Sequence, residues 1–338
     1  MQQEMGRGEL LDGAGHLIER GWARREVRRY ARDQAKPAQP ERLKEWDYYC
    51  ILTPDFGLAL TVADNGQIGF LGVSWMDFQA RGFVNGGVGL AKGAMDMPSS
   101  ADRGDIVRVD PQMQIAFRHE VGGRRLTIHA PEFDKGLGLS GELVLKQPEM
   151  DRMVIATPFS GVPEAFYYNQ KINCLPAAGH VDYAGRRYEF TPDTAFGVLD
   201  WGRGVWTIDN TWYWGSASGR VQGKPFGFNI GYGFGDTSAA SENAVFFDGK
   251  AHKLANVVFH LPQGAHDSAP WRFTSSDGRF EMDFEPIVDR AAAFAMGDIS
   301  SSQHQVFGRF SGHVILDDGE RLEVRDLIGF AEEVQNHW

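Results

Sequence analysis

Residues 200–219, DWGRGVWTIDNTWYWGSASG, hold four of the chain's nine tryptophans together with two aspartates and one arginine. Successive side chains of a β-strand point to opposite faces, so a strand through this region has two distinct sides. One side carries Phe196, Val198 and Asp200, and the other carries Gly197, Leu199 and Trp201. The question this stretch raises is whether it forms a functional site, an aromatic core, or both.

The same two-residue period is found on both sides of this stretch, in the whole chain from Trp46 onward. Segments such as FGLALTVA, IGFLGVSW, RRLTIHA and GELVLK are short, rich in β-branched and aromatic residues, and separated by turn formers. KINCLPAAGHVDYAGRRYEF is typical of a hairpin, and so is WRFTSSDGRFEMDF, where Asp277-Gly278 suits a tight turn. A third turn is expected near Asp318-Gly319. Many short strands without intervening helices predict an all-β protein, and 338 residues suffice for two antiparallel β units.

The predicted domain organisation has three parts. Residues 1–44 form an arm that carries a local charge of +3, with a helical stripe of Ala23, Val27, Tyr30 and Ala31 among arginines. This basic helix either packs across the protein or contacts an anionic surface or a partner subunit. A first β unit spans 45–163 and a second spans 164–338. A C-terminal helix is expected from the spacing of Ile328, Ala331 and Val334.

Composition limits the classes of partner. The net charge of −11 argues against nucleic acid. No segment has the length of apolar sequence that a membrane helix needs, and the N-terminus does not resemble a signal peptide. Two cysteines, Cys50 and Cys174, are too few for a disulfide framework, so a cytoplasmic protein is expected. The oligomeric state is left open.

Several familiar motifs fail on inspection. Residues 86–95, GGVGLAKGAM, lack the Gly-Lys-Ser/Thr ending of a phosphate loop. GSASG at 215–219 misses the nucleophile-elbow pattern by one position. The histidines show no HxH or HExxH spacing, and neither cysteine belongs to a CxxC pair. We therefore predict neither a metal nor a cofactor.

The opening stretch is the best candidate for chemistry. Burial of Asp200 on an apolar strand face would raise its pKa towards the range of an acid catalyst, whereas Arg203, expected across a sharp turn at Trp201-Gly202, would hold it ionised. Tryptophan rings offer an electron-rich face for a cationic group or intermediate. The candidate ligand-binding residues here are Trp201, Trp206, Asn210 and Trp212. The alternative is that Trp212 and Trp214 only fill the core.

Two flanking segments add polar groups to this candidate site. YYNQKINC places Lys171 and Asn173 on one strand face, and a Ser-rich loop carries Glu242 and Asn243. Convergence of Lys171, Asp200, Arg203 and Glu242 on an aromatic pocket would make a reactive site, with Asp200, Arg203 and Glu242 as its catalytic candidates. Structural salt bridges are the alternative reading of the same charges.

The blocks YYNQKINCLPAAG, FGVLDWGRGVWTIDNTWYWGSASG and DDGERLEVRDLIGFAEEVQNHW resemble the bacterial family called domain of unknown function 2804, over nearly the whole chain. More remotely, GVLDWGRG followed by WYWGSASG is similar to the carotenoid 1,2-hydratase and Diels-Alderase group. That second resemblance implies two lipocalin-like barrels in tandem and an acid that protonates an alkene. It would make Asp200 the proton donor, with Trp201, Trp206 and Trp212 lining the site.

Three functions are compatible with these observations. An enzyme would perform acid-assisted hydration, isomerisation or cyclisation of an apolar or amphipathic small molecule in a Trp-rich barrel pocket of the second half. A carrier would hold a lipid or metabolite in the same pocket without turnover. A carbohydrate-binding protein would stack sugar rings on flat tryptophan faces.

Overall fold

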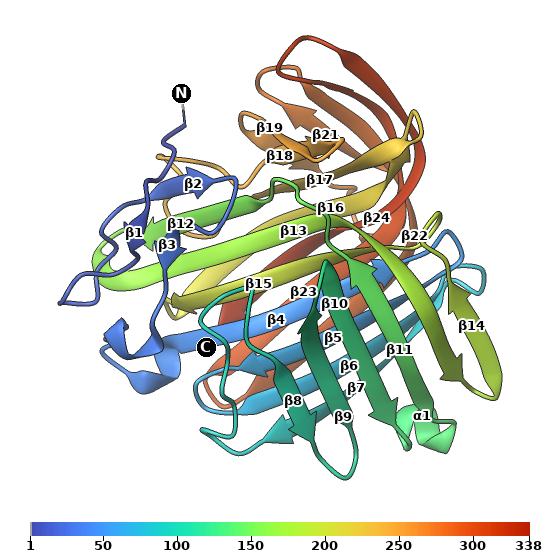
Figure 1. Cartoon of the computed structure of the whole chain (residues 1–338), viewed down its shortest axis with the longest axis horizontal. Helices are drawn as coiled ribbons and strands as arrows, with labels where there is room; N and C mark the ends of the chain where they lie inside the picture. Colours follow the sequence, from blue (N-terminus) through green and yellow to red (C-terminus); the bar gives the residue numbers. More distant parts are fainter. Residues whose placement is uncertain (1) are drawn as a thin grey trace.

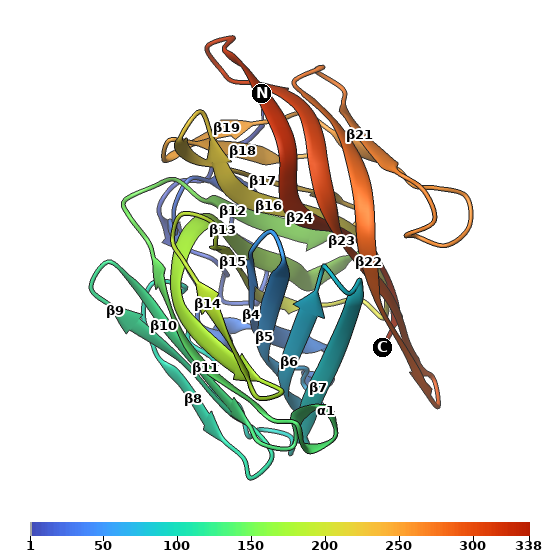
Figure 2. The same cartoon turned by 90° about the vertical axis from the view of Figure 1, so that its right-hand side faces the viewer.

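Two curled antiparallel sheets pack against each other to form the molecule (Figure 1). The computed structural model describes residues 2–338, and all of their side chains except that of Met296. The prediction of an all-β protein with two lipocalin-like antiparallel units is confirmed, and each unit is a curled half-barrel. Figure 2 shows the concave first sheet, in blue to yellow-green, below the second, in yellow to red.

The first sheet contains thirteen strands. They are β2 (Gly21–Ala23), β4 (Leu43–Leu52), β5 (Phe56–Asp64), β6 (Gly69–Asp77), β7 (Gly82–Leu90), β8 (Ile106–Val109), β9 (Gln114–Glu120), β10 (Gly123–Ala130), β11 (Leu139–Lys146), β12 (Met153–Phe159), β13 (Val162–Tyr183), β14 (Arg186–Phe190) and β15 (Phe196–Val205). The main path runs β7-β6-β5-β4-β15-β13-β11-β10-β9-β8, while β12 and β14 pair with β13. A single helical turn, α1 (Phe133–Gly136), connects β10 to β11.

The second sheet contains nine strands in the order β19-β18-β17-β16-β24-β23-β22-β21-β20. They are β16 (Asp209–Val221), β17 (Lys224–Tyr232), β18 (Ala244–Phe247), β19 (Lys250–Lys253), β20 (Val257–His260), β21 (Trp271–Ser275), β22 (Phe280–Met296), β23 (Ile299–Ile315) and β24 (Arg321–His337). The hairpins predicted at Asp277-Gly278 and near Asp318-Gly319 join β21 to β22 and β23 to β24, and both glycines have positive φ.

Apolar side chains form a core inside each half-barrel and a third layer between the sheets. Leu199 and Trp201 point into the first core, whereas Val198 points outward to meet Trp214 and Phe330 of the second sheet. The face assignment predicted for residues 196–201 is therefore confirmed. Because both faces of β15 are covered, all ten of its residues are buried.

The predicted basic helix at residues 23–32 is wrong. That part of the arm forms β2, β3 (Arg28–Arg29) and the start of the 3-10 turn η1 (Arg32–Gln34); β1 (Gly8–Glu9) pairs with β3, and a second turn, η2 (Pro40–Arg42), follows. Its arginines pair with carboxylates outside the segment: Arg28 pairs with Glu19 of the same arm, and Arg32 pairs with Glu45 and with Asp64 at 2.7 Å. These ion pairs outweigh the local helical pattern.

The predicted C-terminal helix is also wrong, because residues 321–337 form β24. This strand lies between β16 and β23 and is covered on both faces, so its buried run from Leu327 to Glu332 has no two-residue period. A continuous apolar run of this kind does not distinguish a helix from a buried strand.

The strands change sheet between β15 and β16, at residues 206–208. The predicted boundary at 163/164 does not coincide with this change, because β13 and β15 belong to the first sheet; the division into domains stays a prediction.

The sharp turn expected at Trp201-Gly202 is absent, since β15 runs straight through to Val205. Cys50 and Cys174 are buried and free. Within residues 2–338, no helix has the length and apolar character to cross a membrane.

Candidate active site between the two sheets

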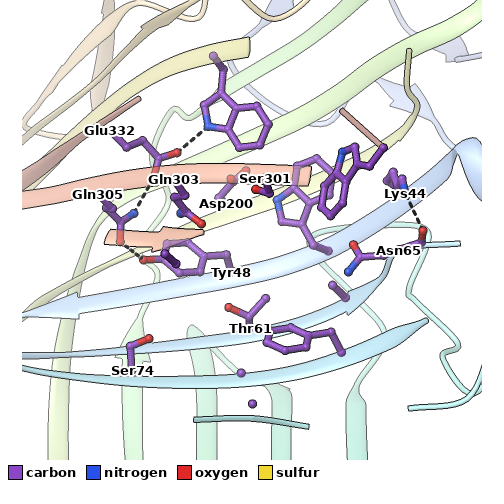
Figure 3. A pocket seen from close by; sticks show the side chains of 18 of the residues that line it. Lys44, Tyr48, Thr61, Asn65, Ser74, Asp200, Ser301, Gln303, Gln305 and Glu332 are labelled. Carbon is purple, nitrogen blue, oxygen red and sulfur yellow. Dashed lines mark hydrogen bonds between the residues drawn. The ribbon is translucent and has the colours of Figure 1, made fainter. Parts of the chain in front are cut away.

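A cavity of about 670 Å³ lies between the two sheets. Its floor is the outer face of β4–β7, β13 and β15, and its roof comes from β16 and β22–β24 (Figure 3). The pocket was expected inside the second barrel. The interior of that half-barrel is instead filled by its own core, and the space opens where the two sheets diverge.

The alternation Asp-Trp-Gly-Arg-Gly in β15 shapes the cavity floor. Asp200 stands opposite Tyr48 and Gly202 stands opposite Trp46 of β4, so these residues share the cavity face. A Cβ atom on Gly202 would lie 2.0 Å from a carbon of the Trp46 ring. Glycine at this position therefore lets the Trp46 indole lie across the strand and line the cavity.

Lys171 and Asp200 form a buried ion pair at the floor. Lys171 Nζ lies 2.9 Å from Asp200 Oδ1, and the two residues are directly opposite each other on β13 and β15. Asn169 Nδ2 donates a hydrogen bond to the same carboxylate oxygen at 2.5 Å. The ammonium group also lies 3.7 Å from the centre of the Trp214 ring, so a cation–π contact holds it from the roof.

Glu332 of β24 is the main acidic group of the roof. Its Oε1 accepts a hydrogen bond from Trp212 Nε1 at 2.7 Å, and its Oε2 accepts one from Gln305 Nε2 at 2.9 Å. Burial raises the pKa of Glu332 to about 7, and the Trp212 hydrogen bond and the charge of Lys171 only partly oppose this effect. Glu332 was not among the residues predicted from the sequence, because its segment was expected to be a helix.

A hydrogen-bond network fixes the orientation of the Gln305 amide. Gln305 Oε1 accepts hydrogen bonds from Tyr48 Oη at 3.0 Å and from Arg290 Nη2 at 2.6 Å. Arg290 also donates to Ser74 Oγ at 3.0 Å. Because the amide oxygen is occupied by these donors, its NH₂ group must face Glu332, as Figure 3 shows. This network joins the floor to the roof.

Glu242 adds a third carboxyl group from the loop between β17 and β18. Asn229 Nδ2 donates to Glu242 Oε2 at 3.2 Å, while Asn229 Oδ1 accepts from Trp214 Nε1 at 2.6 Å. Burial raises the pKa of Glu242, and the nearby Lys171 charge opposes the rise. The structure thus brings Lys171, Asp200 and Glu242 to one cavity.

Aromatic rings wall one end of the cavity. The Trp206 ring packs edge-on against Trp46, with ring centres 5.0 Å apart, and against Trp212, with centres 5.8 Å apart. Phe234 packs edge-on against both Trp206 and Trp212. Trp206 and Trp212 therefore line the cavity, as the sequence suggested, and so does Trp214, whose role was left open.

Arg203 and Trp201 lie away from the cavity, on the opposite face of β15. Arg203 is fully buried and donates hydrogen bonds to Asp47 Oδ1 at 2.9 Å and to the Trp46 carbonyl oxygen at 2.7 Å. Its guanidinium lies 4.0 Å from the centre of the Trp201 ring. These contacts make Arg203 a structural residue of the first core and not an orienting group for Asp200.

Three predicted asparagines also lie outside the cavity lining. Asn173 joins the sheets by donating to Ser216 Oγ at 2.8 Å and to the Phe228 carbonyl oxygen at 3.0 Å. Asn210 accepts a hydrogen bond from Asn336 at 2.9 Å. Asn243 accepts one from the Gly231 amide at 2.7 Å. All three side chains form hydrogen bonds that join separate segments of the chain.

Known structures share this architecture. CghA in complex with Sch210972 superimposes with a TM-score of 0.58 at 10% identity, over 98% of this chain and 97% of that one. A putative AttH from Nitrosomonas europaea gives 0.53 at 16% identity, over 86% and 92%. Kievitone hydratase from Nectria haematococca gives 0.49 at 10% identity, over 100% and 97%. The first two values show that the chain shares its fold with these structures.

No curated protein shows significant sequence similarity to the chain. A family model, by contrast, matches residues 2–338, which is nearly the full sequence. This match agrees with the motifs around DWGRGVW and the C-terminal segment. The chain belongs to the family described as Domain of unknown function (DUF2804).

Proposed function

We propose that the cavity binds an amphipathic small molecule and that Glu332 exchanges a proton with it, in a hydration, isomerisation or cyclisation. The observation that carries this proposal is the position of Glu332: a buried carboxyl group with a pKa of about 7, facing a cavity walled by tryptophans. A general acid works best when its pKa is close to the working pH, because both protonation states are then populated.

Glu332 suits the acid role better than Asp200. The charge of Asp200 is already balanced by the Lys171 ammonium group at 2.9 Å, and Asn169 donates to the same oxygen, whereas both donors to Glu332, from Trp212 and Gln305, are neutral. In this proposal the Lys171–Asp200 pair determines the electrostatic potential at the cavity floor and orients polar groups of the ligand. Trp212 supplies an electron-rich ring face for positive charge that develops after protonation, while the Trp214 ring already contacts the Lys171 ammonium group.

The character of the cavity favours this proposal over the two alternatives. A simple lipid carrier would have an apolar cavity, whereas this cavity is lined by the buried charged residues Lys171, Asp200 and Glu332 and by the half-buried Glu242, and burying charge is costly. A carbohydrate site would present flat, open tryptophan faces, whereas Trp206 packs edge-on within an aromatic cluster. CghA, which shares the fold, was crystallised with the small molecule Sch210972, and this supports ligand binding by analogy of fold alone.

The test begins with the ligand. The full chain is purified from the organism that encodes it and analysed by native mass spectrometry, and bound small molecules are identified after extraction. The identified compound is then incubated with the wild type, Glu332→Gln and the surface control Glu323→Gln. We expect turnover by the wild type and by Glu323→Gln, and a loss of about 100-fold or more in Glu332→Gln.

Two results would contradict the proposal. If the purified chain retains no compound and binds none of those extracted, the cavity is not a ligand site. If a compound binds and is converted equally well by Glu332→Gln, the site exists but Glu332 is not its acid.

A further inference from the structure

Three potential metal ligands meet on the face of the second sheet that points away from the cavity. His304 of β23 and Asp289 of β22 belong to the sheet, and His266 comes from the loop 261–270 between β20 and β21. One donor atom from each lies within 4.8 Å of the other two. They come from three separate segments, so no spacing motif in the sequence could reveal them.

The contacts within this group position both imidazoles. His304 Nδ1 lies 2.7 Å from Asp289 Oδ2, and His266 Nε2 lies 2.9 Å from Glu333 Oε2. The two rings stack in parallel, with centres 3.9 Å apart and planes 8° from parallel. Each imidazole therefore has one nitrogen held by a carboxylate and its ring held by the other imidazole.

One oxygen of the group lacks a partner. Asp289 Oδ1 is buried and has no hydrogen bond to any of the residues that the structure describes. A buried carboxylate oxygen without a donor is costly, because it has lost its water and gained nothing. A cation at this point would satisfy it, and the two adjacent imidazoles are ligands that complete a donor set for a transition metal.

We propose that His266, Asp289 and His304 form a binding site for a divalent transition metal of the zinc type. Zinc bonds of 2.0–2.2 Å to nitrogen and oxygen place tetrahedral ligand atoms about 3.4 Å apart, so ligation needs the donor atoms, now within 4.8 Å of one another, to move closer by up to about 1.4 Å and the rings to rotate out of their stack. Water supplies the fourth ligand. Glu333 remains outside the ligand set and orients His266, as carboxylates behind metal-bound histidines commonly do.

The metal would fasten the loop 261–270 to the sheet. His266 is the ligand from that loop, and its carbonyl oxygen also accepts a hydrogen bond from Trp271 Nε1 at 2.6 Å. The other two ligands directly precede Arg290 and Gln305, whose side chains point to the cavity on the opposite face. The site is thus separate from the cavity and braces the strands that form its roof.

The test is a titration of the metal-free full chain with zinc chloride, measured by isothermal titration calorimetry. We expect one equivalent to bind with a Kd below about 1 μM. His266→Ala and His304→Ala should weaken binding by at least about 100-fold, and Asp289→Asn by at least about 10-fold, since changes even behind a metal ligand cost 10–100-fold. His260→Ala is the matched control: His260 borders the same loop, contacts Thr274, and should leave the affinity unchanged.

A second readout separates a built site from weak binding at surface histidines. Zinc should slow hydrogen exchange of residues 261–270 in the wild type and in His260→Ala, but not in His304→Ala. If circular dichroism shows that the histidine variants misfold, the zinc affinity of the soluble Asp289→Asn variant becomes the test of the site. Absence of a one-to-one complex, or zinc binding that survives in His304→Ala or Asp289→Asn at the wild-type affinity, would overturn the proposal.

Discussion

Asp200 and Arg203, three residues apart on β15, point to opposite faces of the first sheet. Asp200 faces the cavity and pairs with Lys171, whereas Arg203 lies in the half-barrel core and pairs with Asp47. Arg203 therefore neither pairs with Asp200 nor orients its carboxyl group. Substituting one should affect the cavity, and substituting the other should affect the core.

Arg203→Met should strongly destabilise the fold. The variant leaves Asp47 buried without its cation and frees the carbonyl groups of Trp46 and Pro98. Removing one partner of a buried pair costs about 3–5 kcal/mol, which urea denaturation would measure. Arg187→Met, which breaks an exposed pair with Asp182, is the control and should change stability little. Similar losses in both variants would contradict this view of Arg203.

Lys171 and Asp200 should show strong energetic coupling. Lys171→Met leaves a buried carboxylate, and Asp200→Asn leaves a buried ammonium group, so each change alone should destabilise the fold by about 3 kcal/mol. The double variant removes both charges and should recover much of that loss. A double-mutant cycle of unfolding free energies measures the coupling. Additive losses, with no recovery in the double variant, would show that the two charges act independently.

Glu332 should make stability depend on pH. Its pKa of about 7 in the folded protein exceeds the ordinary value of 4.5, so the folded state retains a proton that the unfolded state releases. Stability from this group is fully present below about pH 4.5 and is lost as the pH rises to about 7, by about 3 kcal/mol in total.

Glu332→Gln cannot ionise and removes this contribution. The stability of the variant relative to the wild type should therefore rise between pH 4.5 and 7.5, as measured by urea unfolding at several pH values. Glu323→Gln, at an exposed position of the same strand, should follow the wild type. Parallel pH curves for the wild type and Glu332→Gln would exclude a raised pKa at Glu332.

Gly202→Ala should disturb the cavity floor. The new Cβ would lie 2.0 Å from the Trp46 ring, which stacks on Tyr167 with ring centres 5.7 Å apart. Overpacking of this kind costs about 1–3 kcal/mol and should change the tryptophan fluorescence of the folded state. At Gly82 the nearest atom to a new Cβ is 4.0 Å away, so Gly82→Ala is a control with little expected effect. Unchanged fluorescence and stability in Gly202→Ala would show that Trp46 can move freely.

Local pattern was enough to predict the β architecture. The two-residue period placed Leu199 and Trp201 together on the strand face opposite Asp200, and Asp277-Gly278 located a hairpin, because alternation and turn chemistry depend on neighbouring residues. Among the charged cavity residues, Asp200 was found because it joins an apolar strand face, Lys171 because it belongs to a row of polar residues on one strand face, and Glu242 because it lies in a Ser-rich loop before an apolar strand.

The rest of the site depends on contacts that no local pattern reports. Glu332 lies on a strand buried on both faces, so its segment LIGFAEE has lost the alternation that would mark it as a strand. Gln305 and Arg290 become cavity residues only because β22 and β23 lie over the first sheet. Arg203 was assigned to the site because a turn was expected at Gly202, where the close approach of Trp46 is the actual reason for glycine.

The cavity takes its floor from one sheet and its roof from the other. Lys171 and Asp200 come from strands before residue 206, and Glu332 comes from a strand after it. Neither half-barrel would therefore carry the site if it were expressed as a separate fragment. The same division offers a route for divergence within the family: the second half can exchange its acid while the first half keeps its ion pair, so that new chemistry arises without rebuilding the floor.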